Sequence, residues 1–228
     1  MSDIQLFCFT YAGGTSAFFD EIEKELNGIA VIKPEYAGHG ARHNEPFYKN
    51  FDELADDIFD KFRTLYNGGK YGLFGYSMGS ITLVEVLKRI INSGMRVPSN
   101  IFLAAHEPHT KSELSHFSSD ELDEMVKLRT IRFGAVPEKL LNNQVFWRTY
   151  LPIYRVDYSL IGTYDFEELN LKADIPATVF YSETDTPLER MKQWERFFPC
   201  CFYQFQGTHF FIRQHYQKMA EIIKSKME

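Results

Sequence analysis

Tyr71-Gly72-Leu73-Phe74-Gly75-Tyr76-Ser77-Met78-Gly79 is the stretch that decides the fold. Its first four residues form a short apolar run, which is typical of a buried strand. The residues that follow it predict an amphipathic helix, with apolar positions at Ile81, Val84, Leu87 and Ile91. Ser77 is therefore expected on a tight turn between a strand and a helix. The flanking glycines favour such a turn because they carry no side chain that would obstruct the backbone.

The pattern Gly-x-Ser-x-Gly, placed between a strand and a helix, is the nucleophile elbow of α/β-hydrolases. The alternative is a glycine-bounded helix start in which the Ser77 side chain serves as an N-cap. We favour the elbow because the motif stands in the strand–turn–helix setting that the elbow requires. Ser77 is thus the predicted nucleophile.

Apolar runs and helical periodicities alternate along most of the 228 residues. Strands are expected at residues 4–10, 29–33, 71–74, 100–104, 178–181 and 202–205. Helices are expected at residues 16–26, 54–65, 81–93 and 188–198, and from residue 212 onward. This alternation predicts a single α/β domain over residues 1–228, with a mostly parallel central sheet and helices on both of its faces.

Residues 106–165 interrupt the alternation, because they show helical periodicity but no convincing strand. Sixty residues of helix are too many for an ordinary crossover, so we predict a helical lid insertion over the carboxyl edge of the sheet, where ligands of open α/β sheets bind. The alternative is a helical excursion of structural value alone. Within the segment, the polar stretch Ser112–Asp120 is expected to be a mobile connection.

A serine hydroxyl needs a base to take its proton, and the base needs an acid to fix its tautomer. In α/β-hydrolases the three follow the chain order Ser, Asp or Glu, His. Asp185 lies on the loop directly after the strand at 178–181 and is the predicted acid, with Glu183 as its rival on the same loop. Asp174 precedes that strand and so lies at the wrong end of the sheet. His209 follows the next strand and is the predicted general base.

Acyl transfer also requires backbone N–H groups directed at the developing oxyanion. One donor is expected from Met78, the residue after the nucleophile. The other is expected from the loop after the first strand, Tyr11-Ala12-Gly13-Gly14, where Ala12 is preferred and Tyr11 is the alternative. A plain strand-to-helix turn would also explain the two glycines.

The composition excludes several classes of function. The net charge is −6 and basic clusters are absent, so nucleic-acid binding is not expected. No apolar run is long enough to span a bilayer and no signal-peptide pattern opens the chain, so we expect a cytoplasmic protein without membrane contact. The three cysteines, Cys8, Cys200 and Cys201, are expected to be free thiols. No ligand spacing suggests a metal site.

Together these motifs resemble the type II thioesterases that accompany nonribosomal peptide and polyketide synthases. The matching stretches are Phe9–Gly14, Gly38-His39-Gly40-Ala41-Arg42, the elbow, Tyr154-Arg155-Val156-Asp157-Tyr158 and Gly207-Thr208-His209-Phe210-Phe211, which span nearly the whole chain. The first two are more discriminating than the elbow, because hydrolases in general lack them.

The resemblance implies that the enzyme hydrolyses acyl or aminoacyl thioesters from the phosphopantetheine arm of acyl or peptidyl carrier proteins. It implies Ser77, Asp185 and His209 as the triad, with Met78 and Ala12 at the oxyanion hole. No cofactor or metal is required, since the arm belongs to the partner, and a monomer is expected. The chain departs from the family pattern at Thr10, at Glu183-Thr184 and at Thr208, and none of these departures removes a reacting group.

Three other functions would use the same scaffold. A serine esterase acting on small acyl esters would share every catalytic residue, and so would an acyltransferase that passes the acyl group to an acceptor other than water. A non-catalytic binding module is disfavoured because Ser, Asp and His are all present in the expected order.

Overall fold

The computed structural model describes residues 4–111, 119–134 and 136–228. Its six strands form one parallel sheet with the order β2-β1-β3-β4-β5-β6. The strands are β1 (Ile4–Phe9), β2 (Ala30–Ile32), β3 (Lys70–Tyr76), β4 (Asn100–Ala104), β5 (Ala177–Tyr181) and β6 (Cys200–Gln204). The α/β class predicted from the alternation is confirmed.

Helices connect these strands. The α-helices are α1 (Asp20–Glu25), α2 (Phe51–Leu65), α3 (Met78–Asn92), α4 (Ser119–Arg132), α5 (Gln144–Thr163), α6 (Leu188–Met191) and α7 (Ile212–Met227). The 3-10 helices are η1 (Ser16–Phe19), η2 (Gly40–Arg42), η4 (Glu138–Leu140) and η5 (Lys192–Arg196). In the described part of the chain, none of them has both the length and the apolarity needed to cross a bilayer.

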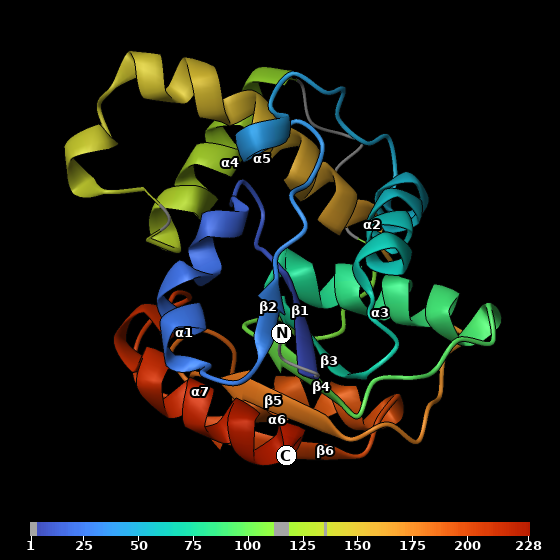
Figure 1. The fold of residues 1–228 in the computed structure, drawn as a ribbon. Helices are drawn as coiled ribbons and strands as arrows, with labels where there is room; N and C mark the ends of the chain where they lie inside the picture. Colours follow the sequence, from blue (N-terminus) through green and yellow to red (C-terminus); the bar gives the residue numbers. More distant parts are fainter. Residues whose placement is uncertain (1–3, 112–118, 135) are drawn as a thin grey trace.

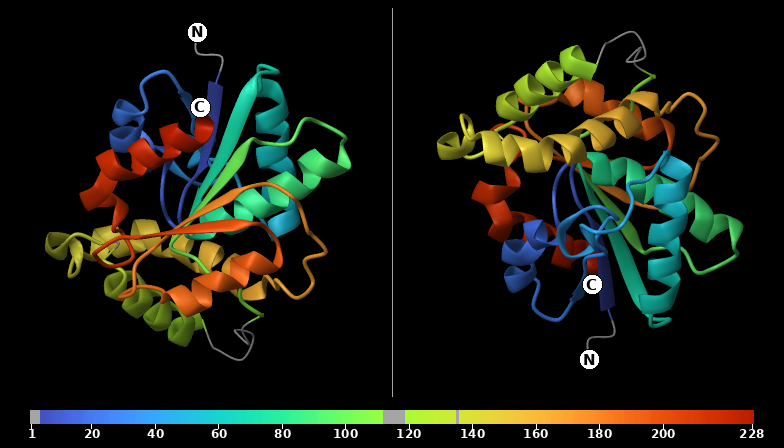
Figure 2. Two further views of the ribbon diagram at one scale, coloured as in Figure 1. Left: turned by 90° about the horizontal axis from the view of Figure 1, so that it is seen from below. Right: turned by 90° about the horizontal axis from the view of Figure 1, so that it is seen from above.

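The sheet is covered on both faces, as Figures 1 and 2 show. Helices α2 and α3 lie on one face, and α1 and α7 lie on the other. Side chains along each strand alternate between two cores, so Phe7 and Phe9 join the first core while Leu6 and Cys8 join the second. Both sets are almost completely buried, which explains the uninterrupted apolar runs in the sequence.

The register of the sheet gathers four loops at one edge. Because all the strands are parallel, their carboxyl ends meet there. Phe9 of β1 pairs with Gly75 of β3, and Ala104 of β4 pairs with Phe180 of β5. The loops after β1, β3, β5 and β6 therefore start close together, and these are the loops that carry the predicted site residues.

Between β4 and β5, the described residues form α4, η4 and α5 and contain no strand. Figure 1 shows α4 and α5 together at the top of the molecule, far from α7. Most of the predicted mobile connection falls on residues 112–118, outside the described residues.

The helix expected at residues 188–198 is partly a 3-10 helix rather than an α-helix throughout. Residues 188–198 form a single turn of α-helix and then the 3-10 helix η5. Met191, Trp194 and Phe197 are all buried, and their spacing of three residues matches the 3-10 repeat.

Candidate active site

The turn at Ser77 has the backbone of a strained elbow. Ser77 has φ 54° and ψ −120°, which side-chain-bearing residues rarely adopt. A Cβ at Gly75 would lie 2.3 Å from the Gly79 carbonyl oxygen, and one at Gly79 would lie 1.9 Å from the Phe9 carbonyl oxygen. Only glycine fits at either position. The Ser77 side chain makes no capping hydrogen bond to α3, so the N-cap alternative is wrong.

The structure brings Ser77, His209 and Asp185 into one hydrogen-bonded chain. His209 Nε2 lies 3.0 Å from Ser77 Oγ, and His209 Nδ1 lies 2.9 and 3.0 Å from the two carboxylate oxygens of Asp185. Ser77 is 9% exposed and His209 is 7% exposed, so the chain is largely shielded from water yet reachable.

The hydrogen bonds define the tautomer of His209. Nδ1 faces only carboxylate oxygens, so it carries the proton that it donates to Asp185. In the neutral ring Nε2 is then an acceptor, and Ser77 Oγ–H donates to it. This is the arrangement in which a histidine can take a proton from a serine hydroxyl.

The rival acid Glu183 points elsewhere. Its Oε1 accepts a hydrogen bond from the Leu188 backbone N–H at 3.3 Å, at the start of α6. The neighbouring hydroxyls of Ser182 and Thr184 both donate to the Gly207 carbonyl oxygen, two residues before His209, and the Thr184 bond is 2.6 Å long. Thr184, where the chain departs from the family pattern, thus ties the loop of the acid to the loop of the base.

Tyr76 makes a second tie to the base. Its hydroxyl donates to the His209 carbonyl oxygen at 2.6 Å, and its side chain is fully buried. Tyr76, the residue before Ser77, therefore holds the main chain of His209. Sequence reasoning named Tyr76 only as the variable residue before Ser77 in the elbow motif and gave it no role.

Met78 and Ala12 as oxyanion donors stay predictions, and the structure places both at the edge of the sheet. Met78 is the first residue of α3, so its N–H is one of the donors that a helix cannot pair internally. Ala12 lies on the buried turn after β1, and Gly13 has φ +75°. The contact of Gly79 with the Phe9 main chain brings these two turns together.

A buried ion pair that the sequence did not assign a role lies behind the Ala12 turn. Asp157 of α5 accepts a hydrogen bond from the Gly13 N–H at 2.6 Å and lies 2.9 Å from His39 Nε2. Both side chains of the pair are 2% exposed. The signal was present, since His39 and Asp157 stand in two of the quoted family motifs, but only the fold shows that they meet.

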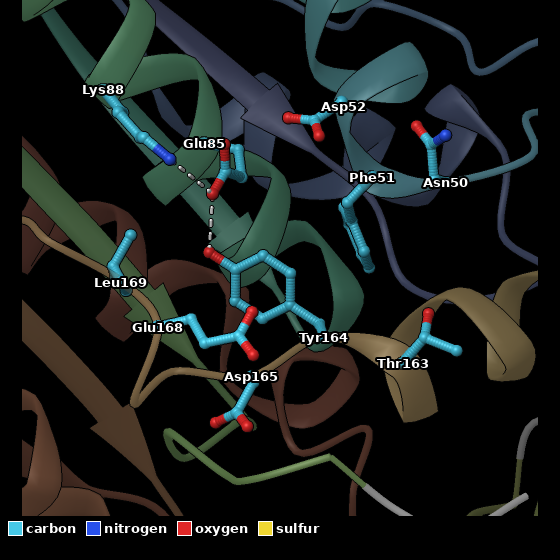
Figure 3. A pocket seen from close by; sticks show the side chains of 10 residues that line it. All are labelled: Asn50, Phe51, Asp52, Glu85, Lys88, Thr163, Tyr164, Asp165, Glu168 and Leu169. Atoms are coloured by element: carbon cyan, nitrogen blue, oxygen red, sulfur yellow. Dashed lines mark hydrogen bonds and ion pairs between the residues drawn. The ribbon is translucent and has the colours of Figure 1, made fainter.

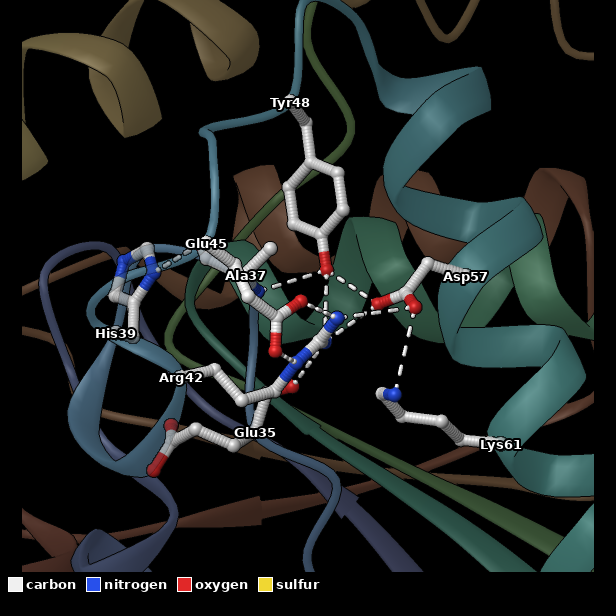
Figure 4. A network of polar contacts seen from close by, with 8 residues as sticks. All are labelled: Glu35, Ala37, His39, Arg42, Glu45, Tyr48, Asp57 and Lys61. Carbon is white, nitrogen blue, oxygen red and sulfur yellow. Dashed lines mark hydrogen bonds and ion pairs between the residues drawn. The ribbon is translucent and has the colours of Figure 1, made fainter.

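Figure 4 shows what holds the loop of His39 in place. Arg42 forms ion pairs with Glu45 and Asp57 and donates to the Glu35 carbonyl oxygen at 2.8 Å. Tyr48 accepts a hydrogen bond from the Ala37 N–H at 2.9 Å and donates to Asp57. The Gly-His-Gly-x-Arg motif is therefore a rigid loop that presents His39 inward.

A surface depression, shown in Figure 3, is lined by ten residues at the start of α2, in α3 and at or after the end of α5, and none of them belongs to the predicted triad. Within it the Tyr164 hydroxyl donates to Glu85 at 2.8 Å, and Arg89 of α3 donates to the other oxygen of Glu85 at 2.7 Å. We interpret it as the junction that fixes the end of α5 to α3, because these polar groups are paired with one another.

One aromatic side chain covers the base. Phe133, just after α4, stacks on the His209 ring with centroids 4.3 Å apart and an interplanar angle of 22°. The Arg129 guanidinium lies over both Phe133 and Tyr158, at 5.5 and 5.1 Å from the ring centroids. Sequence reasoning placed this segment above the site but could not single out Phe133.

The chain resembles known proteins over its whole length. The family model described as "Thioesterase domain" matches residues 4–227. Linear gramicidin dehydrogenase LgrE of Brevibacillus parabrevis is 26% identical and is aligned over 100% of this chain and 89% of its own. Thioesterase PikA5 of Streptomyces venezuelae is 25% identical over 99% of this chain and 82% of its own.

Among solved structures, ClbQ from the colibactin NRPS/PKS pathway superposes with a TM-score of 0.85 at 23% identity, covering 98% of this chain and 96% of its own. That likeness shows the shared fold. With the family match over residues 4–227, it confirms the resemblance that the motifs indicated. The chain belongs to the thioesterase domain family and is a thioester hydrolase.

Proposed function

We propose that this protein is a type II thioesterase, which removes acyl or aminoacyl groups from the phosphopantetheine arm of acyl or peptidyl carrier proteins. The observation that carries the proposal is His209, which bridges Ser77 and Asp185 within hydrogen-bond distance on a thioesterase scaffold. Two relatives support the proposal: PikA5 is named a thioesterase, and ClbQ comes from the colibactin NRPS/PKS pathway.

The proposed reaction proceeds in two halves. Ser77 Oγ attacks the thioester carbonyl carbon while His209 Nε2 takes its proton, and the oxyanion is held by the N–H groups of Met78 and Ala12. The C–S bond then breaks, the thiol leaves with the proton from His209, and an acyl-serine remains. Water attacks this ester with His209 again as base, which releases the carboxylic acid and restores Ser77.

The chemistry suits a carrier-bound thioester. A thioester carbonyl is less stabilised by resonance than an amide carbonyl, and a thiolate is a good leaving group. A triad with two backbone donors is sufficient, so the proposal includes no metal or diffusible cofactor. We further propose that the protein acts as a monomer in the cytoplasm, where its carrier partners would be found.

A dehydrogenase activity, which the name of the gramicidin relative attributes to that protein, is not the function we propose here. The turn after β1 reads Tyr11-Ala12-Gly13-Gly14 rather than Gly-x-Gly-x-x-Gly, the pattern that binds dinucleotides at this position. A serine esterase or an acyltransferase remains the alternative, since either would use the same triad.

The test compares the same acyl group attached to a carrier protein and to free pantetheine. Acyl-loaded carrier protein and the same acyl group on free pantetheine should both be hydrolysed, with a higher kcat/KM for the carrier. Ser77→Ala should reduce kcat by about a millionfold and abolish labelling by a fluorophosphonate, because the triad acts as a unit.

Equal kcat/KM for both carriers would favour an esterase. Transfer of the acyl group to an added amine or alcohol faster than to water would favour an acyltransferase. More than about a tenth of the wild-type kcat in Ser77→Ala would overturn the assignment of the nucleophile.

A further inference from the structure

Helix α5 reaches the turn after β1 at two positions that are three residues apart. Asp157 accepts the hydrogen bond from the Gly13 N–H at 2.6 Å. Tyr154 packs so closely that a Cβ at Gly13 would lie 2.0 Å from its ring. Residues three apart share one face of a helix, so both contacts come from the same side of α5. The position of Gly13, next to the predicted donor Ala12, is set by this face.

The bond from Gly13 is stronger than an ordinary backbone bond, because its acceptor is charged. The same oxygen of Asp157, Oδ2, also faces His39 Nε2 at 2.9 Å. The other ring nitrogen, His39 Nδ1, faces the Ala37 carbonyl oxygen at 3.0 Å. Both ring nitrogens therefore face acceptors, and both must carry a proton to make these bonds. The geometry describes an imidazolium paired with a carboxylate in the interior.

The charge state agrees with the surroundings of His39. Burial alone would lower its pKa, but the Asp157 carboxylate and the two hydrogen bonds outweigh burial, so the pKa lies above its ordinary value of 6.5. The charged and titratable groups that face His39 are Asp157 from α5 and, from its own loop, Glu35 and Tyr36. Burial keeps the pKa of Tyr36 well above 10, so Tyr36 stays neutral.

A buried carboxylate without a counter-charge would be costly, and it would lose its charge or draw in water. His39 supplies that counter-charge from a loop that Arg42 holds rigid. Asp157, only 2% exposed to solvent, therefore accepts its two hydrogen bonds beside a counter-charge, directly behind the turn of Ala12.

We propose that Asp157, paired with His39, is a positioning residue for the oxyanion hole: it holds Gly13 so that the Ala12 N–H is presented to the carbonyl oxygen on Ser77. This inference rests on the proposed acyl transfer, and it assigns to the two family motifs that contain His39 and Asp157 a joint role in the chemistry. Neither residue touches the substrate.

The experiment compares two isosteric changes on opposite sides of α5. Asp157→Asn keeps an oxygen for Gly13 but loses the charge that pairs with His39. Asp123→Asn is the matched control, because Asp123 of α4 pairs with Arg155, which like Asp157 belongs to α5, at 2.6 and 2.7 Å. Both variants are assayed with an acyl-pantetheine, which needs no carrier docking.

Asp157→Asn should lower kcat about tenfold with KM nearly unchanged, because an oxyanion donor acts mainly in the transition state. The affinity for an alkyl boronic acid, whose tetrahedral adduct on Ser77 mimics that state, should fall by the same factor. The control should stay within about twofold of wild type.

The pH profile gives a readout that a purely structural role would not move. The pKa of His39 is raised in the folded protein. The chain of hydrogen bonds from His39 through Asp157 to Gly13 is therefore complete below the ordinary pKa of His39, and it is lost as the pH rises through the folded value. The wild-type kcat should therefore fall on the alkaline side, at a pH above 6.5. In Asp157→Asn this decline should move to lower pH.

Either of two kinetic results would overturn the proposal while leaving the proposed function intact. One is an unchanged kcat and boronate affinity in folded Asp157→Asn, and the other is an equal loss of kcat in Asp157→Asn and Asp123→Asn. If the wild type does not hydrolyse the thioester at all, the proposed function fails instead. If Asp157→Asn does not fold, the test is an NMR titration of the wild-type protein. The chemical shift of the Gly13 amide proton should then change as His39 titrates. A Gly13 amide shift that does not change as His39 titrates would also reject the proposal.

Discussion

Helices α4 and α5 were predicted as parts of one lid over residues 106–165, yet they are held very differently. Helix α5 is fixed to the body of the protein by the buried pair of Asp157 and His39 and by the bond from Tyr164 to Glu85. Helix α4 is held to α5 by the ion pair of Asp123 with Arg155, which is partly exposed. It also leaves Leu128 60% exposed.

The inserted segment between β4 and β5 therefore contains one helix, α5, that buried polar contacts fix to the body of the protein, and one helix, α4, that is held by a partly exposed ion pair. Opening α5 would separate a buried charge pair and release Gly13, so α5 belongs to the wall of the active site. Opening α4 would break a partly exposed ion pair, the contact of Arg129 with Tyr158 and the stacking of Phe133 on His209, and it would uncover the buried Val126. It would separate no buried charge pair among the described residues. We therefore restrict the predicted lid motion to α4 and Phe133, which follows it directly.

The largest expected effect concerns the predicted triad, whose loops belong to neither α4 nor α5. Asp185→Asn should lower kcat by about ten thousandfold, because an asparagine stabilises the wrong tautomer of His209. Glu183→Gln, the matched change on the same loop, should cost no more than about threefold, since Glu183 bonds only to the start of α6. Both are measured as kcat on one acyl-pantetheine.

The reverse ranking would transfer the role of the acid to Glu183. Equal, small losses of kcat in Asp185→Asn and Glu183→Gln would mean that the acid lies elsewhere. Thermal unfolding of both variants serves as the control for folding.

The second effect compares the two helices directly, by hydrogen exchange of the free protein. Amides in α4 should exchange about a hundredfold faster than those in α5, because separating the buried pair that holds α5 costs about 3 kcal/mol or more. Addition of acyl-loaded carrier protein should slow the exchange of α4 and leave that of α5 unchanged.

Equal protection of α4 and α5 in the free protein, unaffected by the carrier, would break the comparison and make α4 a second rigid wall. The strands β3 and β4 provide the internal reference for fully protected amides.

The smallest effect concerns Phe133. Phe133→Ala removes an aromatic contact worth about 1 kcal/mol, so Ser77 should react about fivefold faster with a bulky fluorophosphonate than it does in the wild type. Labelling by a small fluorophosphonate should change less, since access limits only the larger probe. Phe133→Leu, which keeps an apolar cover, is the control. A uniform loss with both probes would mean that Phe133 supports His209 rather than covers it.

Much of this arrangement could be predicted from local patterns. The elbow, the loops after each strand and the chain order of the triad are features of short stretches, so Ser77, Asp185 and His209 could be chosen from the sequence alone. Position relative to a strand excluded Asp174 but left Glu183 as a rival on the loop of Asp185, and the structure places Asp185 against His209.

The rest depended on contacts between distant segments. His39 and Asp157 are 118 residues apart, and nothing in either stretch indicates that one carboxylate would serve both His39 and Gly13. The same holds for Phe133, because helical periodicity predicts a helix but not which ring will face the base. The bond from Thr184 to Gly207 required knowledge of how two loops approach each other.

The parallel sheet has a consequence for how the enzyme matures. Ser77 and His209 are 132 residues apart, and His209 follows β6, the strand at the sheet edge that pairs only with β5. Contacts of such long sequence separation are entropically costly to close and form late in folding. A partly folded chain therefore carries the nucleophile on its elbow without a base beside it. Catalytic competence appears only when the last strand has joined the sheet, so incomplete molecules are chemically silent toward acyl groups.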